Sequence, residues 1–263
     1  MIPIKDNIAL LRLPLVTYAL VAINVIVYLL SIRHGGSFFG GPSESVEVRW
    51  GAIPYEFTHP SSHCALLAAS GPQGESVSTV ACTGQAGVLG SAPSQPATWQ
   101  TAFSSMFLHA SFLHIAGNML FLAIFGPAVE DAIGRLRYGA FYLLGGLVAL
   151  AVQVLASPGS TSPTLGASGA IAAVLGGYLL MYPRARVLSL VIVVFFVTLV
   201  ELPAVVLLGF WIILQVIVGV TGLAGSGGEG VAYFAHIGGF AFGLLAIKLL
   251  ARRHPPRRAI AAL

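Results

Sequence analysis

The chain has 263 residues, of which 57% are hydrophobic and 8% charged, with a mean hydropathy of +0.89. A soluble globular domain carries about 25% charged residues, so this composition excludes an ordinary soluble protein and indicates an integral membrane protein. The formal net charge of +4 does not indicate a nucleic-acid partner, because the 13 Lys and Arg stand at the ends of apolar segments and form no basic patch.

The first apolar segment covers residues 13–32 and follows a short stretch, residues 1–12, that carries Lys5 and Arg12. A crossing takes about 20 apolar residues, so the segment is long enough to be a transmembrane helix. It is not expected to be a cleavable signal peptide, because the apolar run is long and no small-residue cleavage site follows it.

Residues 33–98 are rich in Gly, Ser, Pro and Thr and contain both cysteines, which predicts a long extramembrane loop. Its half nearer the next span, residues 70–96, has a composition that favours partial disorder. In an oxidising compartment a bond between Cys64 and Cys82 would close a loop of about 19 residues and stabilise it by about 3 kcal/mol.

A metal site is the alternative for the cysteines. His59, His63, Cys64 and Cys82 could hold a metal ion together, but their spacing matches no standard zinc site. The sequence therefore favours a disulfide, and we expect no metal and no cofactor.

Residues 99–250 contain further apolar segments that predict five more crossings. They cover residues 102–125, closed by Gly126-Pro127 and a charged turn, then 138–156, then 168–183, then a segment starting at Pro203, and finally 231–250. Residues 187–199 are too short to cross and are expected to be an interfacial or re-entrant segment. The predicted fold is an all-α polytopic bundle of six transmembrane helices, with a basic tail at residues 251–263.

Positive residues set the expected orientation. Short cytoplasmic loops are enriched in Lys and Arg, and with six crossings all the clusters of this chain fall on one side. The residues are Lys5, Arg12, Arg135, Arg137, Arg184, Arg186, Arg252, Arg253, Arg257 and Arg258. Both termini are then cytoplasmic, the long first loop is outside, and Ser168 and His236 lie near the outer ends of their spans.

Ser168 stands where a polar loop meets the fourth apolar segment, and His236 stands in the last one. Taken alone, neither residue indicates catalysis, because Ser and Gly commonly cap helices and small residues allow membrane helices to pack closely. Small residues on both segments would allow close packing, namely Gly166, Gly169, Ala173, Gly176 and Gly177 on one and Gly239 and Gly243 on the other. The imidazole could then accept the serine proton, and because no Asp or Glu is placed to orient it, we expect a dyad.

His114 and Asn118 lie four residues apart in the second predicted span and so share a helix face. Beside a serine nucleophile they could stabilise an oxyanion, a contribution of about 3 to 4 kcal/mol per donor in hydrolases. The alternative is polar contact between helices, worth roughly 0.6 kcal/mol each. For His109, nearer the outer interface, we expect a structural role.

These residues resemble the motifs of the rhomboid family of intramembrane serine proteases. The matching stretches are Gly166-Ala167-Ser168-Gly169, His236 with Gly239 and Gly243, and His114 with Asn118. The resemblance runs from about Trp99 to Leu250 and includes the turn with Glu130. It implies that Ser168 is the nucleophile and His236 the base, and that the oxyanion is bound by His114, Asn118 and the Ser168 backbone N–H.

Two features depart from many members of the family. Trp99 is followed by Gln100 where relatives carry Trp-Arg, and the loop before it is long. Ala172 stands one turn after the serine, where some relatives have an aromatic residue that packs on the histidine. These changes bear on substrate access and on how His236 is held.

The resemblance implies that the substrates are transmembrane segments of other proteins, cut near the outer face of a membrane that we expect to be a prokaryotic plasma membrane. Entry is expected between the second and fifth spans, with Phe210 and Trp211 as a gate and residues 222–230 as a glycine-rich lid. The main alternative is a catalytically silent relative that binds membrane clients. A transporter is disfavoured because no internal repeat is seen, and a metalloprotease because His-Glu-x-x-His is missing.

Overall fold

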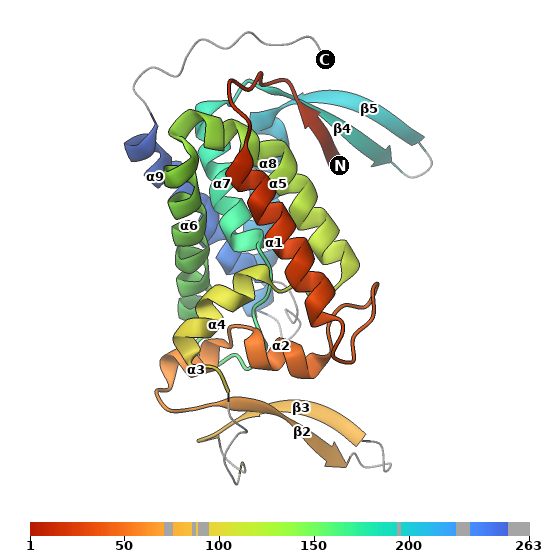
Figure 1. Ribbon diagram of the computed structural model, residues 1–263, viewed down its shortest axis with the longest axis vertical. Coiled ribbons are helices and arrows are strands. Elements are labelled where there is room, and N and C mark those ends of the chain that lie inside the picture. Colours follow the sequence, from red (N-terminus) through yellow and green to blue (C-terminus); the bar gives the residue numbers. More distant parts are fainter. Residues whose placement is uncertain (71–75, 86–87, 89–94, 194–195, 225–231, 252–263) are drawn as a thin grey trace.

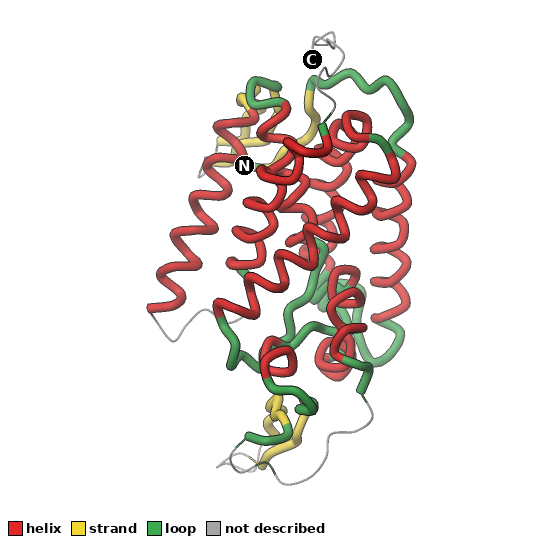
Figure 2. Tube along the Cα trace, turned by 90° about the vertical axis from the view of Figure 1, so that its left-hand side faces the viewer, coloured by secondary structure: helices red, strands yellow, loops and turns green. Residues whose placement is uncertain are grey.

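The computed structural model describes residues 1–70, 76–85, 88, 95–193, 196–224 and 232–251. Apolar helices form a bundle at its centre (Figures 1 and 2): α1 (Leu15–Ser31), α5 (Phe112–Ile133), α6 (Arg135–Ala156), α7 (Ser168–Met181), α8 (Ala204–Ala224) and α9 (Tyr233–Leu250). Four of them, α5, α6, α8 and α9, are long and apolar enough to cross a membrane, whereas α1 and α7 are shorter, with 17 and 14 residues. The molecule is an integral, multi-pass membrane protein.

Two antiparallel sheets show that the expected all-α fold was incomplete. At one end of the bundle, β1 (Ile2–Asp6), β4 (Arg186–Val193) and β5 (Phe196–Pro203) pair in the order β1-β4-β5. The segment expected to be interfacial or re-entrant is therefore the β4–β5 hairpin. Its run of Val, Leu and Ile favours extended backbone, and pairing with β1 satisfies one of its edges.

The second span begins and ends later than the sequence predicted. Residues 102–125 do not form one helix, because α4 (Thr98–Ser104) and the 3-10 turn η1 (Ser105–Phe107) come first and α5 starts at Phe112. Pro127 was expected to end the helix but lies inside α5, where the neighbouring residues are buried. The break comes instead at Gly134, whose φ of 88° is a left-handed conformation that favours glycine.

Glu130, expected in a charged turn, is 2% exposed and lies in α5. Its carboxylate accepts hydrogen bonds from the backbone N–H groups of Val16 and Thr17, at 3.0 and 2.7 Å, and from the Thr17 hydroxyl at 2.7 Å. The first N–H groups of α1 have no partner within the helix, and the N-terminal end of a helix favours negative charge. Glu130 thereby fixes α1 against α5.

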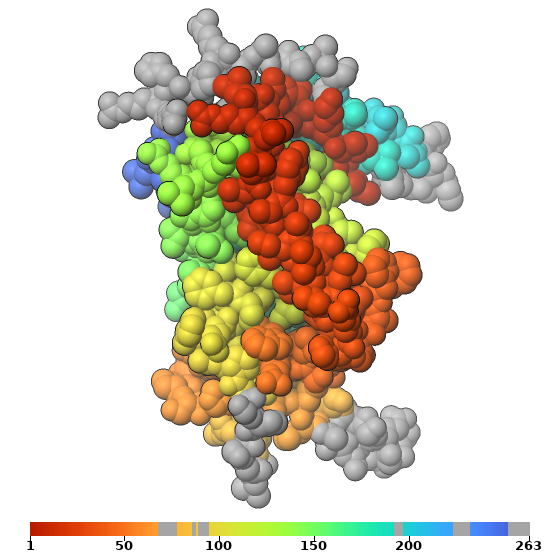
Figure 3. Space-filling model, viewed as in Figure 1, coloured from red at the N-terminus to blue at the C-terminus, as the bar shows by residue number. Residues whose placement is uncertain are grey.

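The first loop is folded into what we call the outer cap, consisting of α2 (Glu44–Trp50), α3 (Pro54–Thr58), β2 (Cys64–Ser70) and β3 (Ser76–Cys82). It covers the end of the bundle away from the N-terminus and from the end of α9 (Figures 1 and 3). The expected disorder over residues 70–96 does not extend to β3, and residues 71–75, 86–87 and 89–94 lie outside the described part of the chain.

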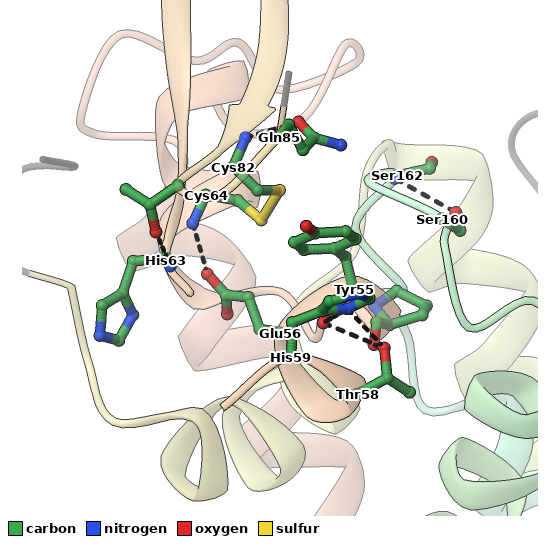
Figure 4. The surroundings of a disulfide bond; sticks show 12 residues. Tyr55, Glu56, Thr58, His59, His63, Cys64, Cys82, Gln85, Ser160 and Ser162 are labelled. Atoms are coloured by element: carbon green, nitrogen blue, oxygen red, sulfur yellow. Dashed lines mark hydrogen bonds between the residues drawn. A yellow bond between two sulfur atoms is a disulfide. The ribbon is translucent and has the colours of Figure 1, made fainter. Parts of the chain in front are cut away.

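A disulfide joins Cys64 and Cys82 where β2 begins and β3 ends (Figure 4). Because the sulfurs are bonded to each other, they are not available for the alternative metal site. Glu56 lies beside the bond and accepts a hydrogen bond from the Cys64 N–H at 2.7 Å. Burial raises the pKa of the Glu56 carboxyl, and this hydrogen bond lowers it in part.

The outer cap is bonded to the loop that leads into α7. The N–H of Ala52 donates to the carbonyl of Thr164 at 3.1 Å, and the N–H of Thr164 donates back at 2.8 Å. The N–H of Tyr55 donates to the carbonyl of Ser160 at 3.0 Å. The cap therefore holds the backbone just before Ser168.

The opposite end of the bundle gathers the N-terminus, the α5–α6 break and β4 (Figure 1). The N–H of Asn7 donates to the carbonyl of Arg186 at 3.1 Å, and the Arg135 side chain donates to the carbonyl of Leu13 at 3.1 Å. The positive residues of these segments thus share one end, as the predicted orientation requires. The arginines from 252 onward lie outside the described residues.

Candidate active site

Ser168 is the first residue of α7, and the chain reaches it through a constrained turn. Gly166 has a φ of 111°, which a residue with a Cβ rarely adopts, and its N–H donates to the carbonyl of Ser105 at 2.8 Å. With the Ala52–Thr164 pairing on the other side, the loop is held by backbone bonds from two directions. The serine hydroxyl is thus presented by fixed backbone.

His236 lies in the first turn of α9 and is 8% exposed. Its Nε2 is 2.7 Å from the Oγ of Ser168. The two helices approach closely through the small residues that the sequence singled out. A Cβ built on Gly239 would overlap the carbonyl oxygen of Gly169, and one on Gly243 would overlap that of Ala173. Glycine at both positions permits the short distance between the serine and the histidine.

The other ring nitrogen of His236 has a partner that sequence reasoning missed. Its Nδ1 lies 2.7 Å from Oε1 of Gln215 on α8. The ring of Trp211, one turn earlier on α8, has its centroid 5.7 Å from that of His236 with the planes at 40°. The sequence places no acid near His236, and the α7 position where some relatives carry an aromatic residue is the fully buried Ala172. The available signal was an amide four residues after Trp211 in an otherwise apolar segment.

His114 and Asn118 lie on α5, on the side of the Gly166 turn. A Cβ built on Gly166 would come 2.6 Å from Nε2 of His114 and 3.4 Å from Nδ2 of Asn118, so both nitrogens face that backbone. Asn118 is 9% exposed, and its Nδ2 is buried with no hydrogen-bond partner in the part of the chain that the structure describes. A buried donor without a partner is costly and often marks a functional site.

His109 is fully buried next to the same loop. Its Nε2 accepts a long hydrogen bond of 3.5 Å from the Ala167 N–H, and its ring makes an edge-on contact with that of His114, with centroids 5.1 Å apart. The expected structural role for His109 stays a prediction, and these contacts fit it.

A cavity of about 340 Å³ joins the polar groups. Residues of α5, α7, α8 and α9 line it, among them His114, Asn118, Ser168, Trp211, His236, Leu113 and Phe121. Of the two residues expected to form a gate, Trp211 lines the cavity, whereas Phe210 is 49% exposed on the outside of α8. Apolar walls with a few convergent polar groups are typical of a site that binds a substrate chain.

Helix α8 is the least buried of the four long helices. Only 22% of the most apolar stretch of α8 is buried within the protein, against 39 to 50% of the corresponding stretches in the other three. The lid expected at residues 222–230 falls largely outside the described residues, which stop at 224 and resume at 232.

Within the described residues, no group of three or more His, Cys, Asp or Glu side chains is close enough to hold a metal ion. The nitrogens and the hydroxyl around the cavity can instead accept, donate and transfer protons. The arrangement contains a nucleophile, a base in contact with it, and hydrogen-bond donors near the same backbone turn. Such a set is suited to acyl transfer.

The sequence and its relatives identify a family. The family model that describes the Rhomboid domain matches residues 96–253. RHOMBOID-like protein 4 of Arabidopsis thaliana is 36% identical over 152 residues, which are 57% of this chain and 34% of that protein. Rhomboid protein 1, mitochondrial, of Saccharomyces cerevisiae is 35% identical over 91 residues, 33% of this chain and 26% of that protein.

Presenilin-associated rhomboid-like protein, mitochondrial, of Bos taurus is 34% identical over 84 residues, 31% of this chain and 22% of that protein. The matched regions thus span between about a fifth and a third of these relatives' lengths. All three relatives are eukaryotic, so they give no support to the prokaryotic plasma membrane expected above.

Proposed function

Because the chain belongs to the rhomboid family, we propose that it is an intramembrane serine endopeptidase that cuts transmembrane segments of other membrane proteins. The observation that carries this proposal is the 2.7 Å contact between Ser168 Oγ and His236 Nε2 at a substrate-sized cavity. A silent relative that only binds clients needs neither group in contact with the other. That second candidate therefore has less support.

In the proposed acylation step, Oγ of Ser168 attacks the carbonyl carbon of the substrate peptide bond while its proton moves to Nε2 of His236. The carbonyl π pair becomes the oxyanion, which accepts hydrogen bonds from Asn118 Nδ2, from His114 Nε2–H and from the Ser168 N–H. This N–H is among the first of α7 and has no acceptor within the helix. When the intermediate collapses, the C–N bond breaks and the imidazolium gives its proton to the leaving amine.

In deacylation the roles repeat with water. Water enters from the outer side, His236 Nε2 takes one of its protons, and the oxygen attacks the ester carbon of the acyl-enzyme. The tetrahedral intermediate then releases a carboxylic acid product, and the proton on Nε2 returns to Ser168 Oγ. No further reactant is required, so a serine, a histidine and the oxyanion donors suffice.

The proposed setting is a bilayer crossed by all six apolar helices, with both termini cytoplasmic and the outer cap outside. The grouping of positive residues at the end opposite the cap supports this orientation. The membrane is proposed to be a prokaryotic plasma membrane, the partners are transmembrane substrates and lipid, and no nucleic-acid partner or cofactor is proposed.

A substrate helix must unwind to be cut. A continuous helix hides its carbonyls in hydrogen bonds between residues i and i+4, so we expect cleavage only where the outer end of the client contains Gly, Pro or polar residues. The resemblance to the rhomboid family favours Ala or another small residue at the cut bond. The test uses vesicles containing the purified protein and a single-span substrate with an outward N-terminus, in two forms: Gly and Pro intact, or replaced by Leu.

We expect the first form to be cut near its outer end and the all-Leu form at least about tenfold more slowly, since unfolding a stable helical turn is added to the barrier. Equal rates, or cleavage that maps to the cytoplasmic end, would contradict this mechanism.

The two gate residues are now expected to behave differently. Phe210→Ala should raise the cleavage rate a fewfold if entry between α5 and α8 limits turnover, because its exposed ring can only obstruct or pack against the incoming helix. Trp211→Ala should lower the rate, since its ring packs on His236. Initial rates at saturating substrate measure both, and Ile213→Ala, another exposed position of α8, is the control. A faster Trp211→Ala enzyme would show that the ring acts as a gate alone.

A further inference from the structure

We propose that Gln215 is a positioning residue that holds His236 in the tautomer required of the base; this inference rests on the proposed function. The feature to be explained is a short polar chain across three helices. Ser168 on α7, His236 on α9 and Gln215 on α8 are joined by successive contacts of 2.7 Å, one at each ring nitrogen of the histidine.

The contact at Nδ1 determines which nitrogen carries the proton. The carbonyl oxygen of an amide only accepts hydrogen bonds, so Oε1 of Gln215 pairs with an Nδ1 that bears hydrogen. In a neutral imidazole the lone pair is then on Nε2, which faces the Ser168 hydroxyl. The opposite tautomer would place an N–H against the serine and could not accept its proton.

The location of Gln215 argues against a side chain that only fills space between helices. Its neighbours Leu214 and Val216 are 40 and 41% exposed, whereas Gln215 lies on the partly buried face that meets α9. A polar side chain in an apolar membrane helix costs free energy unless it is hydrogen-bonded. That this side chain occurs opposite His236 and contacts it at 2.7 Å indicates a function for the contact.

An amide also avoids a cost that an acid would bring. A buried carboxylate must be desolvated, and before the reaction it would face a neutral ring with no compensating charge. The amide dipole holds the Nδ1–H in the resting state and still favours the imidazolium when the serine proton arrives. Trp211, four residues earlier on the same helix, fixes the plane of the ring. Helix α8 thus does for His236 what an acid does in a catalytic triad and what an α7 aromatic residue does in some relatives.

The first experiment measures kcat and KM against pH in vesicles for wild type, Gln215→Leu and Gln215→Glu, with the single-span Gly/Pro substrate. Gln215→Leu should lower kcat about 10- to 100-fold, part of the 10²–10⁴ that a general base contributes, and leave KM within about twofold. Gln215→Glu should recover most of the activity and move the acidic limb of its pH profile upward, because the carboxylate stabilises the imidazolium. Thr221→Val, at an exposed hydroxyl on the same helix, should change neither.

A role in packing alone would move stability but not the pH profile. Wild-type kcat in Gln215→Leu, or a Gln215→Glu profile with an unchanged acidic limb, would overturn the proposal.

The second experiment does not depend on activity. Nitrogen-15 NMR of histidine-labelled Ser168→Ala protein, with His236→Ala to assign the signal, reports which ring nitrogen is protonated. We expect Nδ1–H with Gln215 present and a shift toward Nε2–H in Gln215→Leu. An Nε2–H ring with Gln215 intact would refute the positioning role even if the enzyme is active. A wild-type protein that has the Nδ1–H tautomer but cuts nothing would instead refute the proposed function.

Discussion

Ser168→Ala and His236→Ala should each abolish proteolysis, lowering kcat by at least about 10⁴-fold while the protein remains folded in detergent. The reason is that the two side chains act as a unit: without the hydroxyl there is no nucleophile, and without Nε2 the hydroxyl keeps its proton. In subtilisin-type enzymes such losses reach about 10⁶, with little further loss when both groups are removed. The double variant should therefore be no slower than either single variant.

Matched controls are available in the same chain. Ser162 is exposed in the loop that precedes α7, and His34 is exposed near the end of α1, so Ser162→Ala and His34→Ala should keep wild-type rates. Cleavage of the single-span substrate followed by gel and mass spectrometry gives the rates, and thermal unfolding checks the fold. Full activity in His236→Ala would remove the dyad from the mechanism.

Asn118→Ala should lower kcat about 10²–10³-fold with little change in KM, since an oxyanion donor acts mainly in the transition state. His114→Ala should act in the same direction, and we expect the pair to be non-additive because both donate to one oxygen. Removing Asn118 also removes a buried amide nitrogen that has no partner among the described residues, so the variant should not lose stability on that account.

Asn24 provides the control for this prediction. It is a buried residue of α1 that does not line the cavity. Its side-chain Nδ2 donates a hydrogen bond to the carbonyl of Leu20 at 2.8 Å. Asn24→Ala should lower the unfolding temperature and leave kcat unchanged, the reverse of Asn118→Ala. The two quantities are obtained from single-turnover cleavage and from thermal unfolding. A wild-type kcat in Asn118→Ala would show that Asn118 only makes a polar contact between helices and does not bind the oxyanion.

The sequence was informative where one local pattern determines the outcome. Apolar runs predicted the helices, and the glycines around Ser168 and His236 predicted two faces able to approach, because close backbone contact requires residues without large side chains. The prediction that the helix ends at Pro127 was wrong. Proline usually ends a helix because it removes a backbone hydrogen bond, but packing inside α5 outweighs that loss. The β4–β5 hairpin was not predicted, because periodicity alone cannot tell whether a short apolar run is a strand or a helix.

The partner of His236 could not be found from the sequence for a different reason. Gln215 is 21 residues away along the chain, and only the packing of α8 on α9 brings it to Nδ1. Likewise, nothing in the pattern of residues 33–98 predicted that Ala52 would pair with Thr164 and hold the loop before Ser168.

Fluorophosphonate labelling would show whether Ser168 is an activated serine. The reagent forms a stable adduct with a serine whose proton is taken by a neighbouring base, and it requires no knowledge of the natural substrate. Purified wild-type protein should take up one adduct, located at Ser168 by peptide mass spectrometry, and Ser168→Ala and His236→Ala should take up none. A folded wild-type protein that is not labelled, or is labelled at another serine, would contradict the account.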